Sequence, residues 1–153
     1  MKTRVSFLCG AFVLILISAL FYLSYPDETI QDGYYTAEAE YFDEYGWKEF
    51  VTIFVSGGKI TTVEYNAKNP SGLVKSWDMD YMRVMNASNG TYPNTYTRIY
   101  AADLLDKQDA EKIDAISGAT HSCYNFKRLA AAAMSKIKEG DTTVVFVDFS
   151  RNE

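Results

Sequence analysis

The sequence contains little cysteine and histidine. Its 153 residues include two cysteines, Cys9 and Cys123, and one histidine, His121. Cys9 lies in an apolar N-terminal run and Cys123 in the polar remainder, so the two are not expected to meet and no disulfide framework is indicated. One histidine and one cysteine outside that run cannot complete a usual zinc shell. At a helix start, residues two apart point to different sides, which argues against a catalytic pair of His121 and Cys123.

Positive charge is also scarce. Lys2 and Arg4 are two of the 15 basic residues, so 13 remain against 20 acidic residues, and the chain after the apolar run carries a formal charge of −7. That excess of negative charge repels a phosphate backbone, and we expect no nucleic-acid partner. A composition that is 48% hydrophobic and 15% aromatic is rich enough to fill the core of one domain, which makes disorder an unsuitable description.

One segment lacks charge altogether. The run from Val5 to Tyr25 is long enough to cross a bilayer as a helix. Lys2 and Arg4 precede it, whereas Asp27 and Glu28 follow it, so the excess of positive charge on the cytoplasmic side predicts a cytoplasmic N-terminus. We therefore expect a single-pass protein of the cell membrane that contacts lipid through its N-terminal helix and has its C-terminal domain on the extracytoplasmic side.

Two other fates of this segment fit less well. A cleaved secretory signal needs small residues after a shorter apolar core, and Ile17-Ser18-Ala19 is the one weak candidate. Lipid attachment at Cys9 is disfavoured because Phe7 and Leu8 before it are bulky, so Cys9 is interpreted as a small apolar residue of the membrane helix. The predicted organisation is a membrane anchor or signal sequence at 1–25, a linker at 26–32 and one domain at 33–150.

The remainder of the chain shows the patterns of strands first. Residues 33–42 alternate between apolar and polar, which predicts a half-buried strand. Residues 47–55 and 59–65 are rich in β-branched and aromatic side chains and flank Ser56-Gly57-Gly58, so we expect an antiparallel hairpin. Residues 143–149 are apolar on both faces, which is typical of a central strand.

Helical patterns occupy the second half. Trp77, Tyr81, Val84 and Met85 recur at helical spacing and predict a helix over 76–87. Residues 91–108 give a mixed signal with a helical stretch through Leu104 and Leu105. The clearest helix follows Thr120, with an apolar stripe and Gly140 at its C-terminal cap. These elements predict an α+β fold, with an antiparallel or mixed sheet and two or three helices, preceded by one N-terminal transmembrane helix.

The segment directly before that helix is a candidate anion site. Free backbone N–H groups at a helix start attract phosphate, and Gly118 and Ala119 leave the backbone open to a ligand. Ser117, Thr120 and Ser122 add hydroxyl groups. The same residues equally fit an ordinary helix cap, so the residues by themselves leave both interpretations open.

The order of these residues, Asp114-x-x-Ser117-Gly118-Ala119-Thr120-x-Ser122, resembles the flavinylation motif of the FMN-binding domain family. That family includes the flavin-bearing subunits of the sodium-pumping NADH:quinone reductase and related ion-pumping complexes. The resemblance implies flavin mononucleotide (FMN) bound covalently through a phosphoester to the Thr120 hydroxyl, attached by a dedicated flavin transferase. Asp114 matches the acidic position used when the transferase acts. The implied cofactor-binding residues are Thr120, Asp114, Ser117, Gly118, Ala119 and Ser122.

The resemblance extends from about residue 33 to residue 149 and includes the hairpin "VTIFVSGGKITTVEY". The chain is shorter than the large subunits of the pumping complexes, so it is not assigned to one of them. The implied function is electron transfer through the covalent FMN, with electrons supplied by a quinone- or NADH-linked system of the membrane. Two alternatives remain: a membrane-anchored ligand- or protein-binding module of the same fold without flavin, and a flavin-dependent reductase of a small extracellular acceptor.

Side chains that could contact the flavin ring are less well defined by sequence. Trp77, Tyr81 and Tyr92 could stack on the ring, although core packing is the more usual use of such residues. Lys75, Arg83 and Arg98 could balance the charge of phosphate or reduced flavin, although solvated surface positions are the more usual expectation.

Overall fold

The computed structural model describes residues 30–150, so the predicted anchor at 1–25 lies outside the described residues. In chain order the elements are β1 (Gly33–Ala39), β2 (Lys48–Ser56), β3 (Lys59–Lys68), the 3-10 turn η1 (Lys75–Trp77), α2 (Met79–Asn89), α3 (Pro93–Lys107), the 3-10 turn η2 (Ala110–Lys112), α4 (Thr120–Glu139) and β4 (Val145–Val147). Within this part of the chain, no helix has both the length and the hydrophobicity that a bilayer crossing needs.

The predicted hairpin is confirmed. β2 and β3 pair antiparallel around a two-residue turn, in which Gly57 and Gly58 both have positive φ, +60° and +71°. A turn of this kind matches the twist of the strands that it joins, and glycine adopts it without a Cβ penalty. The Asp32 carboxylate accepts hydrogen bonds from both glycine N–H groups, at 3.0 and 3.3 Å, and so ties the turn to the start of β1.

The four strands form one mixed sheet in the order β3-β2-β1-β4, with β4 parallel to β1 and the other pairs antiparallel. The prediction of a central last strand is wrong, because β4 lies at the edge of the sheet. Val145 and Val147 pack against the core, whereas Phe146 is 57% exposed on the other face. The Lys48 ammonium lies 5.2 Å from the Phe146 ring centroid. The two apolar faces therefore reflect a core contact on one side and a cation–π contact on the other.

The helix predicted over 76–87 is divided. Asp78 is the N-cap of α2, and its carboxylate accepts a hydrogen bond from the Tyr81 N–H at 2.9 Å. Because the cap residue is extended, Trp77 belongs to η1, and this residue is 71% exposed instead of packing in the core. α2 has no fully buried residue, and its contribution to the core is the partly buried Met85.

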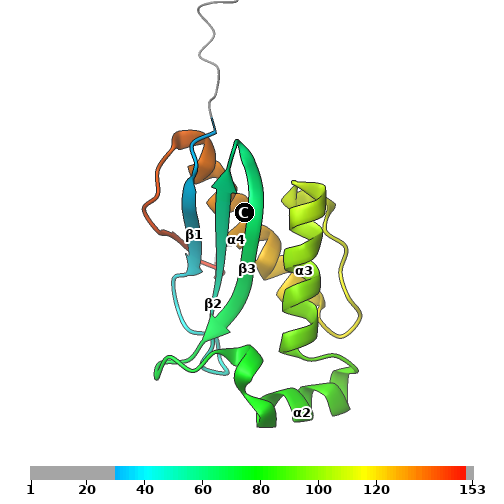
Figure 1. Cartoon of the computed structure of the whole chain (residues 1–153). Coiled ribbons are helices and arrows are strands. Elements are labelled where there is room, and N and C mark those ends of the chain that lie inside the picture. The colour runs from blue at the N-terminus through cyan, green and yellow to red at the C-terminus, as the bar shows by residue number, and fades with distance from the viewer. Residues whose placement is uncertain (1–29, 151–153) are drawn as a thin grey trace, which may run out of the picture.

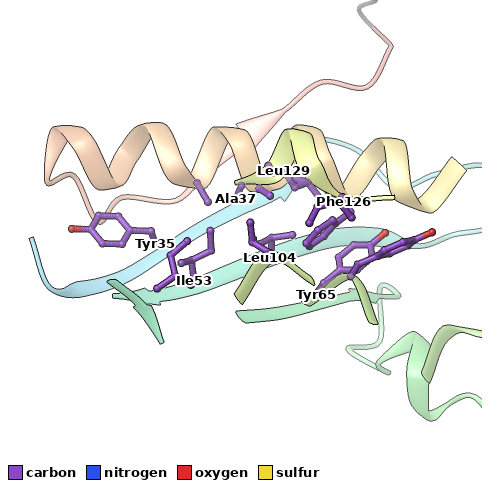
Figure 2. Close-up of a cluster of buried hydrophobic side chains, with 14 of the residues drawn as sticks. Tyr35, Ala37, Ile53, Tyr65, Leu104, Phe126 and Leu129 are labelled. Carbon is purple, nitrogen blue, oxygen red and sulfur yellow. The ribbon is translucent and has the colours of Figure 1, made fainter. Parts of the chain in front are cut away.

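The helix after Thr120 is confirmed as α4, which ends at Glu139 with Gly140 in the left-handed conformation as its C-cap. Figure 1 shows α4 behind the sheet, α3 beside β3 and α2 beyond the ends of the strands. The core fills the space between the sheet and the helices (Figure 2), where the Phe126 ring lies 4.8 Å from Tyr65 and 5.7 Å from Tyr100. An α+β fold with a mixed sheet and three α-helices confirms the predicted class for the described residues.

Candidate flavin site

A tyrosine from α3 holds the loop that carries the candidate motif. The Ala119 N–H donates to the Ile116 carbonyl at 2.9 Å and closes a turn. The Tyr100 phenol accepts a hydrogen bond from the Ile116 N–H at 3.1 Å and donates one to the Ala119 carbonyl at 3.0 Å. Burial raises the pKa of Tyr100 to about 12, so the phenol keeps its proton at neutral pH and can donate. Sequence reasoning missed Tyr100, because the motif lies far from it along the chain.

Gly118 allows α2 to pack against the same loop. Its φ is +80°, and a Cβ at this position would overlap the backbone carbonyl oxygen of Asn89, the last residue of α2. The Asn89 side-chain amide donates to the Gly118 carbonyl at 3.3 Å. Both the conformation and the close approach require glycine at this point of the motif.

The hydroxyl groups of the motif do not cap α4. The N-cap residue is Ala119, and no side chain caps the helix. Thr120 is the first residue of α4 and is exposed, and neither its hydroxyl nor that of Ser117 forms a hydrogen bond with the residues of 30–150. The interpretation of this segment as an ordinary side-chain cap is therefore wrong.

The remaining motif residues point in different directions. Asp114 is 95% exposed, and its carboxylate lies 3.5 Å from the Lys107 ammonium. Ser122 is buried, its carbonyl accepts a hydrogen bond from the Tyr65 phenol at 3.0 Å, and its hydroxyl interacts with the Tyr96 phenol. The loop thus presents Asp114, Ser117 and Thr120 to solvent, whereas Ser122 faces inward.

A cleft of about 470 Å³ opens directly beside the motif. Gly118, Ala119 and Ser122 form one wall, and the opposite side includes residues of α2. A groove of about 510 Å³ lies between β3 and α3, but none of the motif residues lines it. Thr120 does not line this cleft, but its neighbours Ala119 and His121 do, so this is the cleft that adjoins the predicted attachment residue.

A sequence model of the FMN-binding domain family matches residues 45–135, which contain β2, β3, α2, α3, the motif loop and most of α4. The chain belongs to the FMN-binding domain family. It is 38% identical over 136 residues to the "15 kDa lipoprotein" of Treponema pallidum (strain Nichols), a match that covers 89% of this chain and 95% of the relative. It also resembles the crystal structure of the CPE2226 protein from Clostridium perfringens, with 37% identity and a TM-score of 0.75 over 78% of this chain and 98% of that one.

The cleft of this FMN-binding domain contains one buried cation. Lys75 is 6% exposed, and its ammonium lies 5.0 Å from the ring centroid of Tyr81 and 5.7 Å from that of Trp47. Tyr81 also lines the cleft and offers aromatic surface, whereas Tyr96 borders it but is 1% exposed. Aromatic surface can stack on a flavin ring, and a positive charge nearby can stabilise its reduced form, so this lining fits FMN.

The cleft also contains a buried acid. Glu49 is 6% exposed, and its Oε2 atom has no hydrogen-bond partner among the described residues. Sequence reasoning missed Glu49, although a signal was present: in the alternation of β2 it occupies the buried face together with Val51, Ile53 and Val55. A charged residue on the apolar face of a strand needs an explanation, and the cleft provides one.

Several residues considered for ring contact lie elsewhere. Trp77 and Arg98 line the groove between β3 and α3 instead of the cleft. Arg83 is exposed and pairs with Asp80 at 2.9 Å. His121 lies beside Asn125 at 3.3 Å, whereas Cys123 faces the core, where burial raises the pKa of its thiol. Of the six side chains considered for ring contact, Tyr81 and Lys75 line the cleft, and His121 also borders it.

Proposed function

We propose that the protein is a membrane-attached electron carrier whose FMN is bound covalently by a phosphoester to Thr120. The observation that carries this proposal is the exposed Thr120 hydroxyl at the start of α4, on a helix end that no side chain caps. The positive end of the helix dipole and the first-turn N–H groups favour an anionic phosphate at this point. Membership of the FMN-binding domain family supports flavin as the group that carries the phosphate.

The domain supplies the surroundings of the flavin, and the flavin supplies one- and two-electron chemistry when it is bound. Lys75 and Tyr81 line the cleft beside the attachment loop and would hold the ring. A covalent bond keeps the cofactor at a high local concentration even where the pocket itself binds weakly. An open cleft is therefore compatible with a carrier that meets its electron donor and acceptor at the protein surface.

Intact-mass analysis tests the attachment. The chain is expressed together with a flavin transferase, and the wild-type product should be yellow and heavier by one FMN less water. Thr120→Val keeps the shape of the side chain without its hydroxyl and should abolish the mass increase. Thr62→Val makes the same substitution at an exposed threonine of β3, outside the motif, and should retain the mass increase. A bare wild-type chain, or a Thr120→Val product that still carries FMN, contradicts the proposal.

We further propose that attachment to a membrane would bring the carrier close to a quinone- or NADH-linked donor. The matched relative from Treponema pallidum is named a lipoprotein, which supports attachment to a membrane, and the apolar run at 5–25 would provide it in this chain. A transmembrane helix and a lipid on Cys9 are distinguished by labelling cells with a fatty acid: label that disappears in Cys9→Ser indicates a lipid anchor. An unlabelled membrane-bound chain indicates the helix, and a chain recovered wholly in the soluble fraction contradicts both.

A further inference from the structure

Glu49 can be reached from two cavities, although its carboxyl group is buried. It lines the cleft beside the motif and also a cavity of about 210 Å³ on the other side, and His121 borders both. The Oε2 atom of Glu49 and the Oδ1 atom of Asn125 are both buried without a hydrogen-bond partner among the described residues. Unpaired buried acceptors are costly, so a group at this place has a use beyond packing.

Ionisable and polar groups from several neighbouring elements interact with the carboxyl group or line its two cavities. They are Lys75 of η1, Tyr65 of β3, Tyr96 of α3, Tyr81 of α2, Tyr41, Asp43, Glu44 and Tyr45 of the loop before β2, His121 and Asn125 of α4, and Asp148 after β4. Burial is the largest influence and raises the pKa of Glu49 to about 7, while the positive charge of Lys75 and the nearby Asn125 amide oppose the rise. Burial also raises the pKa values of Tyr65 and Tyr96, so both remain phenols. Glu49 is therefore the acid that can change its charge near neutral pH.

Asn125 can serve both charge states of Glu49. The Asn125 Nδ2 atom lies 3.3 Å from the His121 Nε2 atom, and the amide is within hydrogen-bonding reach of Glu49. The amide oxygen can accept a hydrogen bond from the protonated acid, and after a half-turn about its last bond the amide nitrogen can donate one to the carboxylate. A proton can thus arrive or leave without leaving Glu49 unpaired.

We propose that Glu49 is a redox-linked proton-binding site, whose carboxylate binds a proton when the flavin ring in the cleft is reduced and releases it when the ring is reoxidised. This inference rests on the proposed function. An external donor, dithionite in the test, would supply two electrons to the ring together with one proton from water, so the ring would gain one negative charge. Glu49 takes a second proton from water and changes from negative to neutral, so the reduction adds no net negative charge beside Lys75.

The test compares Glu49→Gln with Glu44→Gln in flavin-loaded protein. Gln cannot titrate but keeps the shape of the side chain, and Glu44 is an exposed acid that lines the same cleft. Midpoint potentials are measured from pH about 5.5 to about 9.5. Wild type and Glu49→Gln should agree at the acid end, where Glu49 is neutral in both redox states. At the alkaline end the wild-type potential should be lower than that of Glu49→Gln. For a two-electron couple, the difference should be about 30 mV for each tenfold by which flavin reduction strengthens proton binding at Glu49.

Proton uptake on reduction provides a second readout. At pH about 7.5, wild type and Glu44→Gln should take up more protons for each flavin reduced than Glu49→Gln. The titration of the ring itself is common to the three proteins and cancels in the comparison. A wild-type potential that runs parallel to that of Glu49→Gln across the whole pH range, with equal proton uptake, overturns the inference.

A measurement without flavin separates this inference from the proposed attachment. In the unloaded protein, the ¹³C resonance of the Glu49 carboxyl should titrate near neutral pH, and Lys75→Met should move that titration to higher pH. A titration in the ordinary range of glutamate overturns the inference whether or not flavin binds. Loss of FMN in Thr120→Val together with unchanged redox behaviour in Glu49→Gln would support the attachment and reject the role of Glu49.

Discussion

Replacement of Gly118 by alanine tests how the motif loop is held. The left-handed conformation of this residue costs a non-glycine residue about 1–2 kcal/mol. A Cβ would also overlap the Asn89 carbonyl oxygen, so α2 or the loop has to move. Forcing an extra methyl group into a packed position typically costs about 1–3 kcal/mol more. We expect Gly118→Ala to lower the free energy of unfolding by about 2–5 kcal/mol in total.

Gly90→Ala is the matched control. Gly90 has a φ of +71°, close to that of Gly118, but a Cβ there would have no neighbour within 4 Å. This variant therefore carries only the conformational cost of about 1–2 kcal/mol. Both variants lose the same freedom in the unfolded chain, so that contribution cancels in their difference.

The free energies of unfolding come from urea titrations of the unloaded wild type and the two variants. They are compared only if the free energy falls with urea concentration at the same slope in all three proteins. The difference between the two alanine variants isolates the approach of α2 to the motif loop. Gly118→Ala should be the less stable by about 1–3 kcal/mol. If the two variants are equally stable, Asn89 does not constrain the loop and the reasoning is refuted.

Three further predictions follow from buried or paired groups. Tyr100→Phe removes the hydroxyl that bonds both ends of the motif turn and should lower the free energy of unfolding by about 2–4 kcal/mol in urea titrations. A decrease smaller than the contribution of a single exposed hydrogen bond would count against the role of Tyr100. Burial would raise the pKa of Glu38, but hydrogen bonds from Lys48 and Lys68 outweigh it and hold that pKa below its usual value. The ion pairs of the charged carboxylate therefore stabilise the fold at neutral pH, and this stabilisation is lost as pH falls through the folded-state pKa. Glu38→Gln should cost about 1–2 kcal/mol at neutral pH and less at pH about 3, and a cost independent of pH would reject the ion pairs as its cause. The pKa of Glu49 is raised in the folded protein. The stability contributed by its protonated form is therefore fully present below the unfolded-state pKa of 4.5 and is lost as pH rises through about 7. Unloaded wild type should therefore lose about 3 kcal/mol relative to Glu49→Gln between pH about 4 and about 8.5, and an equal pH profile for the two would contradict the burial of this charge.

The sequence by itself determined the features that depend on neighbours along the chain. The glycine pair of the hairpin, the apolar stripe of α4 and its glycine cap are local patterns, and all three are confirmed. The order of residues from Asp114 to Ser122 indicated the family before any fold was known, because the attachment chemistry uses consecutive residues of one loop. The family match over residues 45–135 confirms that indication, and the covalent bond to Thr120 stays a prediction.

Tertiary structure decided what local patterns leave open. Whether an apolar strand such as β4 lies inside or at the edge of a sheet depends on which strand pairs with it, and here only β1 does. The cleft combines side chains from β2, η1, α2, α3 and α4, which are separated in sequence and meet only because the sheet and helices pack. Glu49 and Lys75 have ordinary neighbours along the chain, and it is their shared burial, which removes water from both charges, that makes them candidates for function.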